Sequence, residues 1–490
     1  MVPKDMSFRP LSGRIHRVIL SPAACSVDLG VGSERGEFVS QDYILGVLGR
    51  PHRAINIIYC YYPFDKGWPN RVSQVFRNRG GFIWGYPYDD YFPYRGGLGG
   101  DPDAEVFEQL REIRRHGQDV TFTLTADCAL TDDHIRAIAR DLKPFGNLRL
   151  RVNHECDGTW FQFNRRYSYT EVARFFVRFA TIVHEEAPNI RMVSCWGTLA
   201  QNTIWGAHSN NTAESLDHEA DLSPTLAAAD VWATDRYLAL HFGWPFRRCE
   251  PSDLGTTYSI STNRDLWKLL ETAHGRFCAL TGQDKGIELC EFNADGSVGG
   301  RHAQSRRAGS FYRDILRGKP AFLKAITYYQ FRDRARLGLE REDPNNREIG
   351  NPSPFLPVYK RLIQDPYFLP GEHWTRNGQD LGVEWRSSED SDGLGWKIRL
   401  AHRPIFLELL LGKGENLMIR AGHTWYYKKP GVELIDVTPA TEQWPLDTPF
   451  PIRLFAPPPE GTNPGCRSSY RSRLSGIPQM RLLYRWNTSK

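Results

Sequence analysis

Short runs typical of β-strands alternate with amphipathic runs typical of helices across the middle of the chain. The strand-like runs cover residues 55–62, 81–88, 120–127, 148–155, 190–197, 231–237, 286–292 and 323–331. The helix-like runs between them include residues 104–116, 131–145, 169–186 and 263–275, and Ser168 with Glu171 forms a capping-box pattern at one helix start. Eight β units alternating with helices predict an α/β fold, a closed (β/α)8 TIM barrel. An open, doubly wound sheet is the competing layout, but no glycine-rich nucleotide fingerprint follows an early strand.

The pattern changes after residue 363. Residues 370–490 have few helical periods, and their alternating runs are separated by turns rich in glycine and proline, which predicts an appended β-sandwich. We therefore divide the chain into an N-terminal segment (1–50), a catalytic barrel (51–365) and an accessory β-sandwich (366–490). The N-terminal segment either lends a strand to the sandwich or covers the floor of the barrel.

Composition excludes several classes of partner. The 62 Lys and Arg against 57 Asp and Glu give a net charge of +5 that is spread along the chain, so no nucleic-acid-binding arm is expected. No segment is apolar for long enough to predict a membrane span. The 14 Trp, 21 Tyr and 26 Phe fit a carbohydrate binder, because the apolar faces of sugars stack on aromatic rings, although core packing accounts for most of these residues.

The cysteines indicate neither zinc nor a disulfide framework. Nine cysteines without CxxC spacing are most simply buried, reduced thiols, which favours an intracellular protein. The first residues lack the apolar core of a signal peptide, although a secreted chain that begins after a removed signal would look the same. No cofactor is predicted.

Two glutamates at strand ends are the strongest candidates for catalysis. Barrel active sites lie at the C-terminal ends of the strands, where Glu155 ends the fourth strand-like run and Glu291 the seventh. Glycoside hydrolysis needs two carboxyl groups beside the scissile bond, roughly 5–5.5 Å apart in retaining enzymes. Glu288 and Glu291 are three residues apart, so on a regular strand they face opposite sides. We expect Glu288 to form a salt bridge beneath the helices and Glu291 to face the site.

Three motifs resemble those of glycoside hydrolase family 26, which groups β-mannanases with some β-1,3-xylanases and lichenases. Residues 154–160 (HECDGTW) are similar to its His-Glu-x-Asn-Gly-x-Trp motif, and residues 285–292 (KGIELCEF) to its Lys-Pro-Ile-x-x-Ala-Glu-Phe motif. The resemblance implies that Glu155 is the acid/base, that Glu291 is the nucleophile and that His154 contacts the sugar. Residues 231–237 resemble the sixth strand with its Asp-x-Tyr ending, which implies that Tyr237 hydrogen-bonds the nucleophile.

Two of the departures from this family bear on the site. Asp157 stands where the family has Asn, and its negative charge is expected to favour the protonated form of Glu155. Asn293 stands where the family has Gly. Further candidates for contact with substrate lie at strand ends or in the loops that follow them, and they are Asp89, Trp160, Trp196, Asp235 and Trp244.

The sequence therefore predicts a retaining glycoside hydrolase that cleaves a β-linked glycan. A non-catalytic carbohydrate-binding protein on the same barrel is the alternative. A metal-dependent barrel hydrolase would need clustered His and Asp at strand ends, where we expect His154 alone among the histidines. Arg236 could reach a carboxylated sugar or pair with Asp235 or Glu291.

Overall fold

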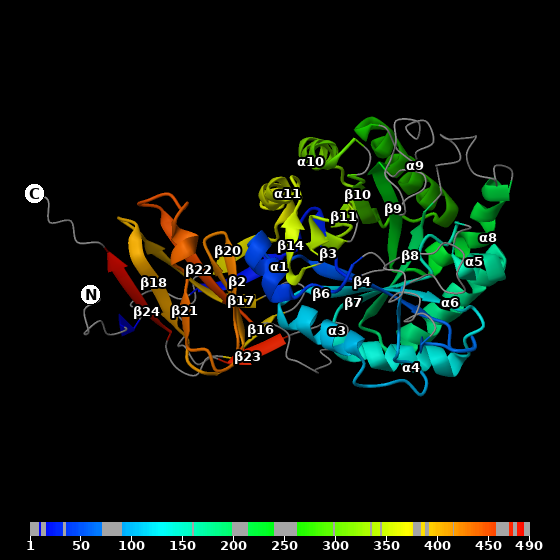
Figure 1. The fold of residues 1–490 in the computed structure, drawn as a ribbon, viewed down its shortest axis with the longest axis horizontal. Helices are drawn as coiled ribbons and strands as arrows, with labels where there is room; N and C mark the ends of the chain where they lie inside the picture. The colour runs from blue at the N-terminus through cyan, green and yellow to red at the C-terminus, as the bar shows by residue number, and fades with distance from the viewer. Residues whose placement is uncertain are drawn as a thin grey trace, which may run out of the picture.

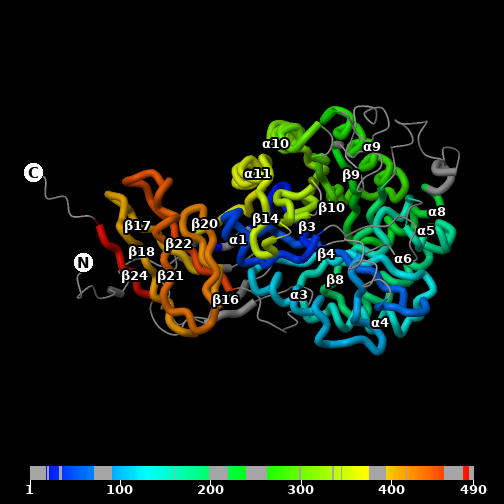
Figure 2. The backbone as a smooth tube through the Cα atoms, in the orientation of Figure 1, coloured from blue at the N-terminus to red at the C-terminus, as the bar shows by residue number. Residues whose placement is uncertain are grey.

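The computed structural model describes most of the chain. The described residues are 9–10, 16–32, 36–70, 91–158, 161–197, 214–239, 262–296, 299–333, 336–343, 345–375, 384–387, 392–414, 416–456, 470–473 and 478–484. They form a barrel wrapped by helices and a separate stack of antiparallel sheets beside it (Figure 1). The backbone trace runs from the blue strand β3 through the green barrel strands before it enters the orange sheets (Figure 2).

Eight parallel strands close the barrel. The sheet order β3-β11-β10-β9-β8-β7-β6-β4 returns on itself because β3 also pairs with β4. The strands are β3 (Ser26–Gly30), β4 (Ala54–Tyr61), β6 (Asp119–Ala126), β7 (Leu148–Val152), β8 (Ile190–Trp196), β9 (Val231–Ala239), β10 (Ile287–Ala294) and β11 (Leu323–Tyr328). The two-residue β5 (Phe92–Pro93) extends the sheet beside β4. This topology confirms the predicted (β/α)8 barrel.

The first barrel strand is not the one that the sequence indicated. β3 lies in the segment predicted to stand outside the barrel, while the strand expected at 81–88 lies outside the described residues. β3 is only five residues long and carries Ser26 and Asp28 at alternate positions. β7 and β10 nevertheless remain the fourth and seventh strands in chain order.

Helices cover the outside of the barrel. They are α1 (Gln41–Leu48), α3 (Glu105–Arg115), α4 (Asp132–Leu142), α5 (Gln162–Arg166), α6 (Tyr169–Glu186), α8 (Glu214–Ala228), α9 (Asn263–Thr281), α10 (Arg301–Gly318) and α11 (Leu356–Leu362), with the 3-10 turns η1 (Lys143–Phe145) and η3 (Pro366–Phe368). α6 begins where expected, since the side chain of Ser168 accepts a hydrogen bond from the backbone of Glu171 in a full capping box. Its buried face carries Phe175, Phe176 and Phe179, each contributing about 1.5–3 kcal/mol on burial.

Two larger antiparallel sheets stand beside the barrel, as predicted for a β-sandwich. One sheet has the order β15-β2-β17-β22-β19-β20 and another β1-β24-β18-β21. Their bounds are β1 (Arg9–Pro10), β2 (His16–Ser21), β15 (Gly371–Thr375), β17 (Asp392–Arg399), β18 (Pro404–Leu410), β19 (Leu417–Ala421), β20 (Thr424–Lys428), β21 (Leu434–Asp436), β22 (Pro449–Phe455) and β24 (Gln479–Tyr484), with the 3-10 turn η4 (Thr438–Thr441) after β21. β16 (Glu384–Ser387) pairs with β23 (Tyr470–Arg473), and β12 (Arg332–Asp333), β13 (Glu340–Asp343) and β14 (Asn346–Pro352) form a small sheet that follows β11.

The N-terminal segment is thus divided between the two units. β1 and β2 join the sheets of the sandwich, and β3 enters the barrel. A separate apolar cluster, in which Leu45 of α1 packs with Met418 and Phe455, connects the barrel side to the sandwich. None of the helices among the described residues is both long and apolar enough to cross a membrane.

Candidate active site

Strand β7 carries the basic residue on which the site is built. Its apolar residues Leu148, Leu150 and Val152 are fully buried in the main hydrophobic core. The alternate residues, Arg149 and Arg151, reach carboxylates that other barrel strands contribute, so they point into the barrel. The Leu-Arg-Leu-Arg-Val alternation therefore places apolar residues outward beneath the helices and arginines inward.

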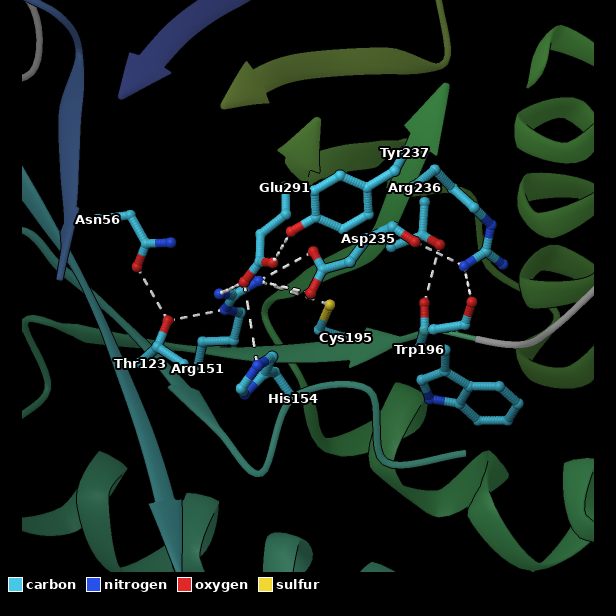
Figure 3. Close-up of polar contacts among 12 residues, drawn as sticks. Asn56, Thr123, Arg151, His154, Cys195, Trp196, Asp235, Arg236, Tyr237 and Glu291 are labelled. Carbon is cyan, nitrogen blue, oxygen red and sulfur yellow. Dashed lines mark hydrogen bonds and ion pairs between the residues drawn. The ribbon is translucent and has the colours of Figure 1, made fainter. Parts of the chain in front are cut away.

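Arg151 connects both sides of the barrel interior and is fully buried (Figure 3). Its Nη1 donates to both carboxylate oxygens of Asp235 at 2.9 Å, and its Nη2 donates to Oε1 of Glu291 at 2.5 Å. Its Nε donates to the Thr123 hydroxyl at 2.8 Å, and that hydroxyl donates to Asn56 at 2.9 Å. Each nitrogen of the guanidinium is thereby bonded, which fixes the group in one orientation.

Glu291 receives hydrogen bonds at both of its carboxylate oxygens. Arg151 bonds Oε1, and the hydroxyl of Tyr237 donates to Oε2 at 2.5 Å. The Nε2 of His154 lies 3.9 Å from the same Oε1 atom (Figure 3). A carboxylate that two donors, one of them cationic, hold in one orientation can act as a nucleophile.

The protonation states of the neighbours agree with that role. Burial lowers the pKa of Arg151, but the carboxylates of Asp235 and Glu291 more than offset this, and the pKa ends well above its ordinary value. Burial, reinforced by Glu291, raises the pKa of the Tyr237 hydroxyl well above its usual range. Arg151 therefore remains charged and Tyr237 remains a hydrogen-bond donor at any working pH.

His154 is a neutral imidazole in this site. Burial, and then the charge of Arg151, lower its pKa well below the ordinary histidine value. Its Nε2 lies 3.4 Å from the hydroxyl of Tyr91, while its Nδ1 is buried without a hydrogen-bond partner in the described part of the chain. The ring also packs against Phe161, with centroids 4.7 Å apart. These contacts fix the ring beside Glu291.

Glu155 lies in the loop directly after β7, in a left-handed backbone conformation with a φ of 51°. Its side chain is half-buried and packs on Gly197, which follows β8. A Cβ at that glycine would come within 2.8 Å of Glu155 Cγ and 3.1 Å of Cδ. Only glycine leaves this space, so residue 197 determines where the Glu155 carboxyl can lie.

Asp157 and Arg236 place opposite charges near Glu155. Asp157 accepts a hydrogen bond from the Gly197 backbone at 2.5 Å. Burial lowers the pKa of Arg236, and the carboxylates of Asp157 and Glu155 act in the opposite direction. The negative charge expected at Asp157 is thus accompanied by a buried positive charge.

Strand β10 contains an irregularity that the sequence did not reveal. Its pairing with β9 shifts register between Leu289 and Glu291, which inserts one extra residue at Cys290. Both Glu288 and Glu291 consequently reach arginines inside the barrel, whereas we expected them to face opposite sides. Glu288 does form a salt bridge, but with Arg53 in the barrel interior at 2.8 Å and not beneath the helices.

The other predicted substrate contacts fall in different environments. Both oxygens of Asp235 bond Arg151 and its side chain is fully buried, so it lies below the surface that a substrate would meet. Trp196 is 1% exposed, with its Nε1 3.1 Å from the Ser194 hydroxyl, and in Figure 3 it points away from Glu291. Asp89, Trp160 and Trp244 lie outside the described residues.

Arg236 is buried, which argues against the predicted contact with a carboxylated sugar. Its guanidinium donates to the backbone carbonyls of Gly197 and Asp235, and it points away from Glu291 (Figure 3). Contact with a carboxylated sugar would need an exposed guanidinium, yet Arg236 is 2% exposed.

Sequence reasoning missed Arg151 and Tyr91. An arginine four residues before Glu155, at an inward position of an alternating strand, was the available signal for Arg151. Tyr91 follows a predicted strand and carried no such signal.

The site also holds atoms of the types that bind metals. Ligand atoms of His154, Asp235 and Glu291 lie within 4.8 Å of one another. The Arg151 guanidinium already bonds both carboxylates, so the protein itself supplies a positive charge beside them. This arrangement suits acid–base and nucleophilic chemistry.

No family model matches this chain, and no curated protein matches it. Among solved structures it is similar to a family 26 β-mannanase from Bacteroides ovatus (12% identity, 70% of this chain and 89% of that one, TM-score 0.39). It is also similar to a β-xylosidase from Caulobacter crescentus (10%, 92% and 98%, 0.44) and a family 51 α-L-arabinofuranosidase from Bifidobacterium longum (11%, 97% and 99%, 0.43). At these identities the similarity describes the arrangement of helices and strands.

Proposed function

We propose that this protein is a retaining glycoside hydrolase that cleaves a β-linked glycan by double displacement. Glu291 is the nucleophile and Glu155 the general acid/base. The observation that carries the proposal is a pair of hydrogen bonds to Glu291, one from Arg151 and one from Tyr237, each 2.5 Å long. Glu291 lies toward the C-terminal end of a barrel strand, where barrel active sites are found.

The proposed reaction has two steps. In the first, a Glu291 oxygen bonds the anomeric carbon as the bond to the leaving oxygen breaks, and Glu155 gives its proton to that oxygen. In the second, Glu155 takes a proton from water, the water oxygen bonds the anomeric carbon, and Glu291 leaves as a carboxylate. Two inversions return the original configuration at that carbon.

The surroundings of Glu291 support the second step in particular. The carboxylate regains its charge as it leaves, and donors that are already in place stabilise charge where it develops without reorganisation. Arg151 and Tyr237 are such donors. The neutral His154, 3.9 Å from Glu291, adds no positive charge beside the nucleophile.

The test uses Glu155→Gln and Glu291→Gln, with Glu185→Gln on the exposed side of α6 as the matched control. Aryl β-glycosides with good and poor leaving groups are the probes, and NMR follows the anomer that is released first. We expect Glu291→Gln to abolish turnover and Glu185→Gln to behave as wild type. We expect Glu155→Gln to fail mainly on poor leaving groups, which need protonation.

Azide distinguishes the two roles. With Glu155→Gln and an activated substrate, azide can attack the glycosyl-enzyme without base assistance, so turnover should recover and give a β-glycosyl azide. Sugar binding without turnover in wild type would favour the non-catalytic alternative. Release of the inverted anomer would contradict the double displacement.

A further inference from the structure

A second site lies at the opposite end of the barrel, where the strands begin. There a partly open cavity of about 290 Å³ separates the barrel floor from the β-sandwich. Residues before or at the start of barrel strands line one side, including His52, Arg53 and Arg149. Arg420 of β19 and Trp425 of β20 line the other side. The cavity is therefore walled by both units and is remote from Glu155 and Glu291.

Positive charge dominates the lining. Arg50, Arg53, Arg149, Arg191 and Arg420 all border the cavity, and Asp119 is the acidic residue among the described lining residues. Asp28 pairs with Arg53, and the other carboxylates that pair with these arginines are shared. Glu288 forms ion pairs with both Arg53 and Arg149. Glu372 serves both Arg420 and Arg453, and Asp119 also pairs with Arg114. The residues that line the cavity therefore carry more positive than negative charge when they are taken together.

Arg50 is the clearest part of that excess. It is 5% exposed, and its Nε and Nη1 donate to the backbone carbonyls of Pro51, Ile363 and Phe368. It has no carboxylate partner among the described residues, and its Nη2 makes no hydrogen bond to them. Burial, with a contribution from Arg420, lowers its pKa to about 10. Asp28 acts on Arg50 only from a distance, and a buried guanidinium without a carboxylate in contact is costly, so an anion in the cavity would offset this cost.

Two further nitrogen atoms of residues that line the cavity lack partners. Nδ1 of His52 and Nε of Arg420 are buried without a hydrogen-bond partner in the described part of the chain. His52 is 2% exposed and Arg420 is 6% exposed. Buried polar atoms in native proteins are almost always hydrogen-bonded, so guanidinium nitrogens of Arg50 and Arg420 without partners beside one cavity point to an acceptor ligand.

We propose that this cavity binds a phosphoryl dianion, either inorganic phosphate or the phosphate group of a small sugar phosphate. A dianion supplies the charge that Arg50 lacks and presents several acceptor oxygens to donors from both units. A volume near 290 Å³ lies at the lower end of small-molecule pockets, so a sugar phosphate fits the space as well as the inorganic ion. Because its donors come from both units, bound anion ties the barrel to the sandwich.

Calorimetric titration of the full chain with sodium phosphate and with glucose 6-phosphate, each at constant ionic strength in chloride buffer, tests the proposal. We expect saturable binding of at least one of them, with a matching rise in Tm. Binding should be stronger at about pH 7.5 than at about pH 5.5, because phosphomonoesters take up a proton near pH 6. Tighter binding of glucose 6-phosphate would identify the organic ligand, and equal binding the inorganic ion.

Arg50→Met and Arg420→Met should each weaken binding about tenfold or more, the loss expected for one charge-assisted hydrogen bond. Arg347→Met is the control, because Arg347 is 85% exposed and pairs only loosely with Glu37 at 3.8 Å. Glycosidase turnover should be unchanged in all three, which separates this site from the catalytic one. If wild type binds neither anion, or if both cavity variants bind as wild type does, the proposal is wrong. Should Arg50→Met fail to fold, Arg420→Met and the wild-type titrations still decide.

Discussion

Replacing Tyr237 with phenylalanine separates the two steps of the proposed mechanism. The change removes one hydroxyl, which donates to Oε2 of Glu291 at 2.5 Å, and leaves the ring in place against Tyr329. In the glycosyl-enzyme Glu291 is an ester, and its charge returns only as it leaves. The hydrogen bond is therefore stronger in the second transition state than in the intermediate, so its loss slows breakdown of the intermediate.

The size of the effect follows from the bond that is lost. A hydrogen bond to a charged group is worth about 1.5–3 kcal/mol, and each 1.36 kcal/mol is tenfold in rate, so we expect the second step to slow by about 10- to 150-fold. The first step starts from the charged carboxylate, whose ground state the same bond stabilises, so kcat/KM should change much less. An aryl glycoside with a good leaving group should then give a burst of phenol followed by slow turnover.

The control is Tyr59→Phe. Tyr59 is 5% exposed, and its hydroxyl donates to the neutral Gln109 side chain at 2.6 Å, away from the site. That variant should lose about 0.5–1.5 kcal/mol of folding stability and keep its kcat. An unchanged kcat without a burst in Tyr237→Phe, or an equal fall in kcat and kcat/KM, would refute the assignment of this hydroxyl to the departure of Glu291.

Three other changes probe the same site. Gly197→Ala should push the Glu155 side chain aside and lower kcat by about 100-fold, the cost of a misplacement near 1 Å. Gly275→Ala, with nothing within 4 Å of the added methyl, should keep wild-type kinetics, and equal rates in both would contradict the packing argument. Arg151→Met leaves two buried carboxylates without their cation and should cost about 3–5 kcal/mol in urea unfolding, so a neutral effect would exclude a structural role for the pair. Because the pKa of His154 lies well below its unfolded value near 6.5, the unfolded chain binds a proton that the folded chain does not. Wild-type stability should therefore fall below about pH 6.5 by up to about 1.4 kcal/mol per pH unit relative to His154→Gln, and a constant difference between pH 5 and 7 would show that the imidazole titrates normally.

Most of the fold prediction came from the alternation of apolar and polar residues within strands and from the order of the strands along the chain. The alternation in β7 identified the strand, although the predicted run ended at Glu155 and the strand itself ends at Val152. The helix over Tyr169–Glu186 could be predicted to the residue, because Ser168 and Glu171 mark its start by local chemistry. Local signals of this kind do not depend on distant parts of the chain.

The features that were missed depend on pairing between distant segments. β3 carries polar residues at alternate positions, and it becomes a barrel strand only because it pairs with both β11 and β4. The extra residue at Cys290 is defined by the register against β9, which is set 50 or more residues earlier in the chain. Without that register, the three-residue spacing of Glu288 and Glu291 predicted the wrong relative orientation.

Arg151 shows why the proposed catalytic pair could be recognised from the sequence before the residues that surround it. A buried arginine is costly unless it is paired, and Val193, Cys195, Ala233 and Cys290 form a cluster of small side chains that leaves room for it in the barrel. Asp235 takes two of its hydrogen bonds and Glu291 takes one. An arginine devoted to Glu291 alone would hold the nucleophile in its ground state, whereas one divided with Asp235 orients Glu291 and leaves part of its charge available for attack. Since the three residues come from β7, β9 and β10, this division is a property of the closed barrel and of no single motif.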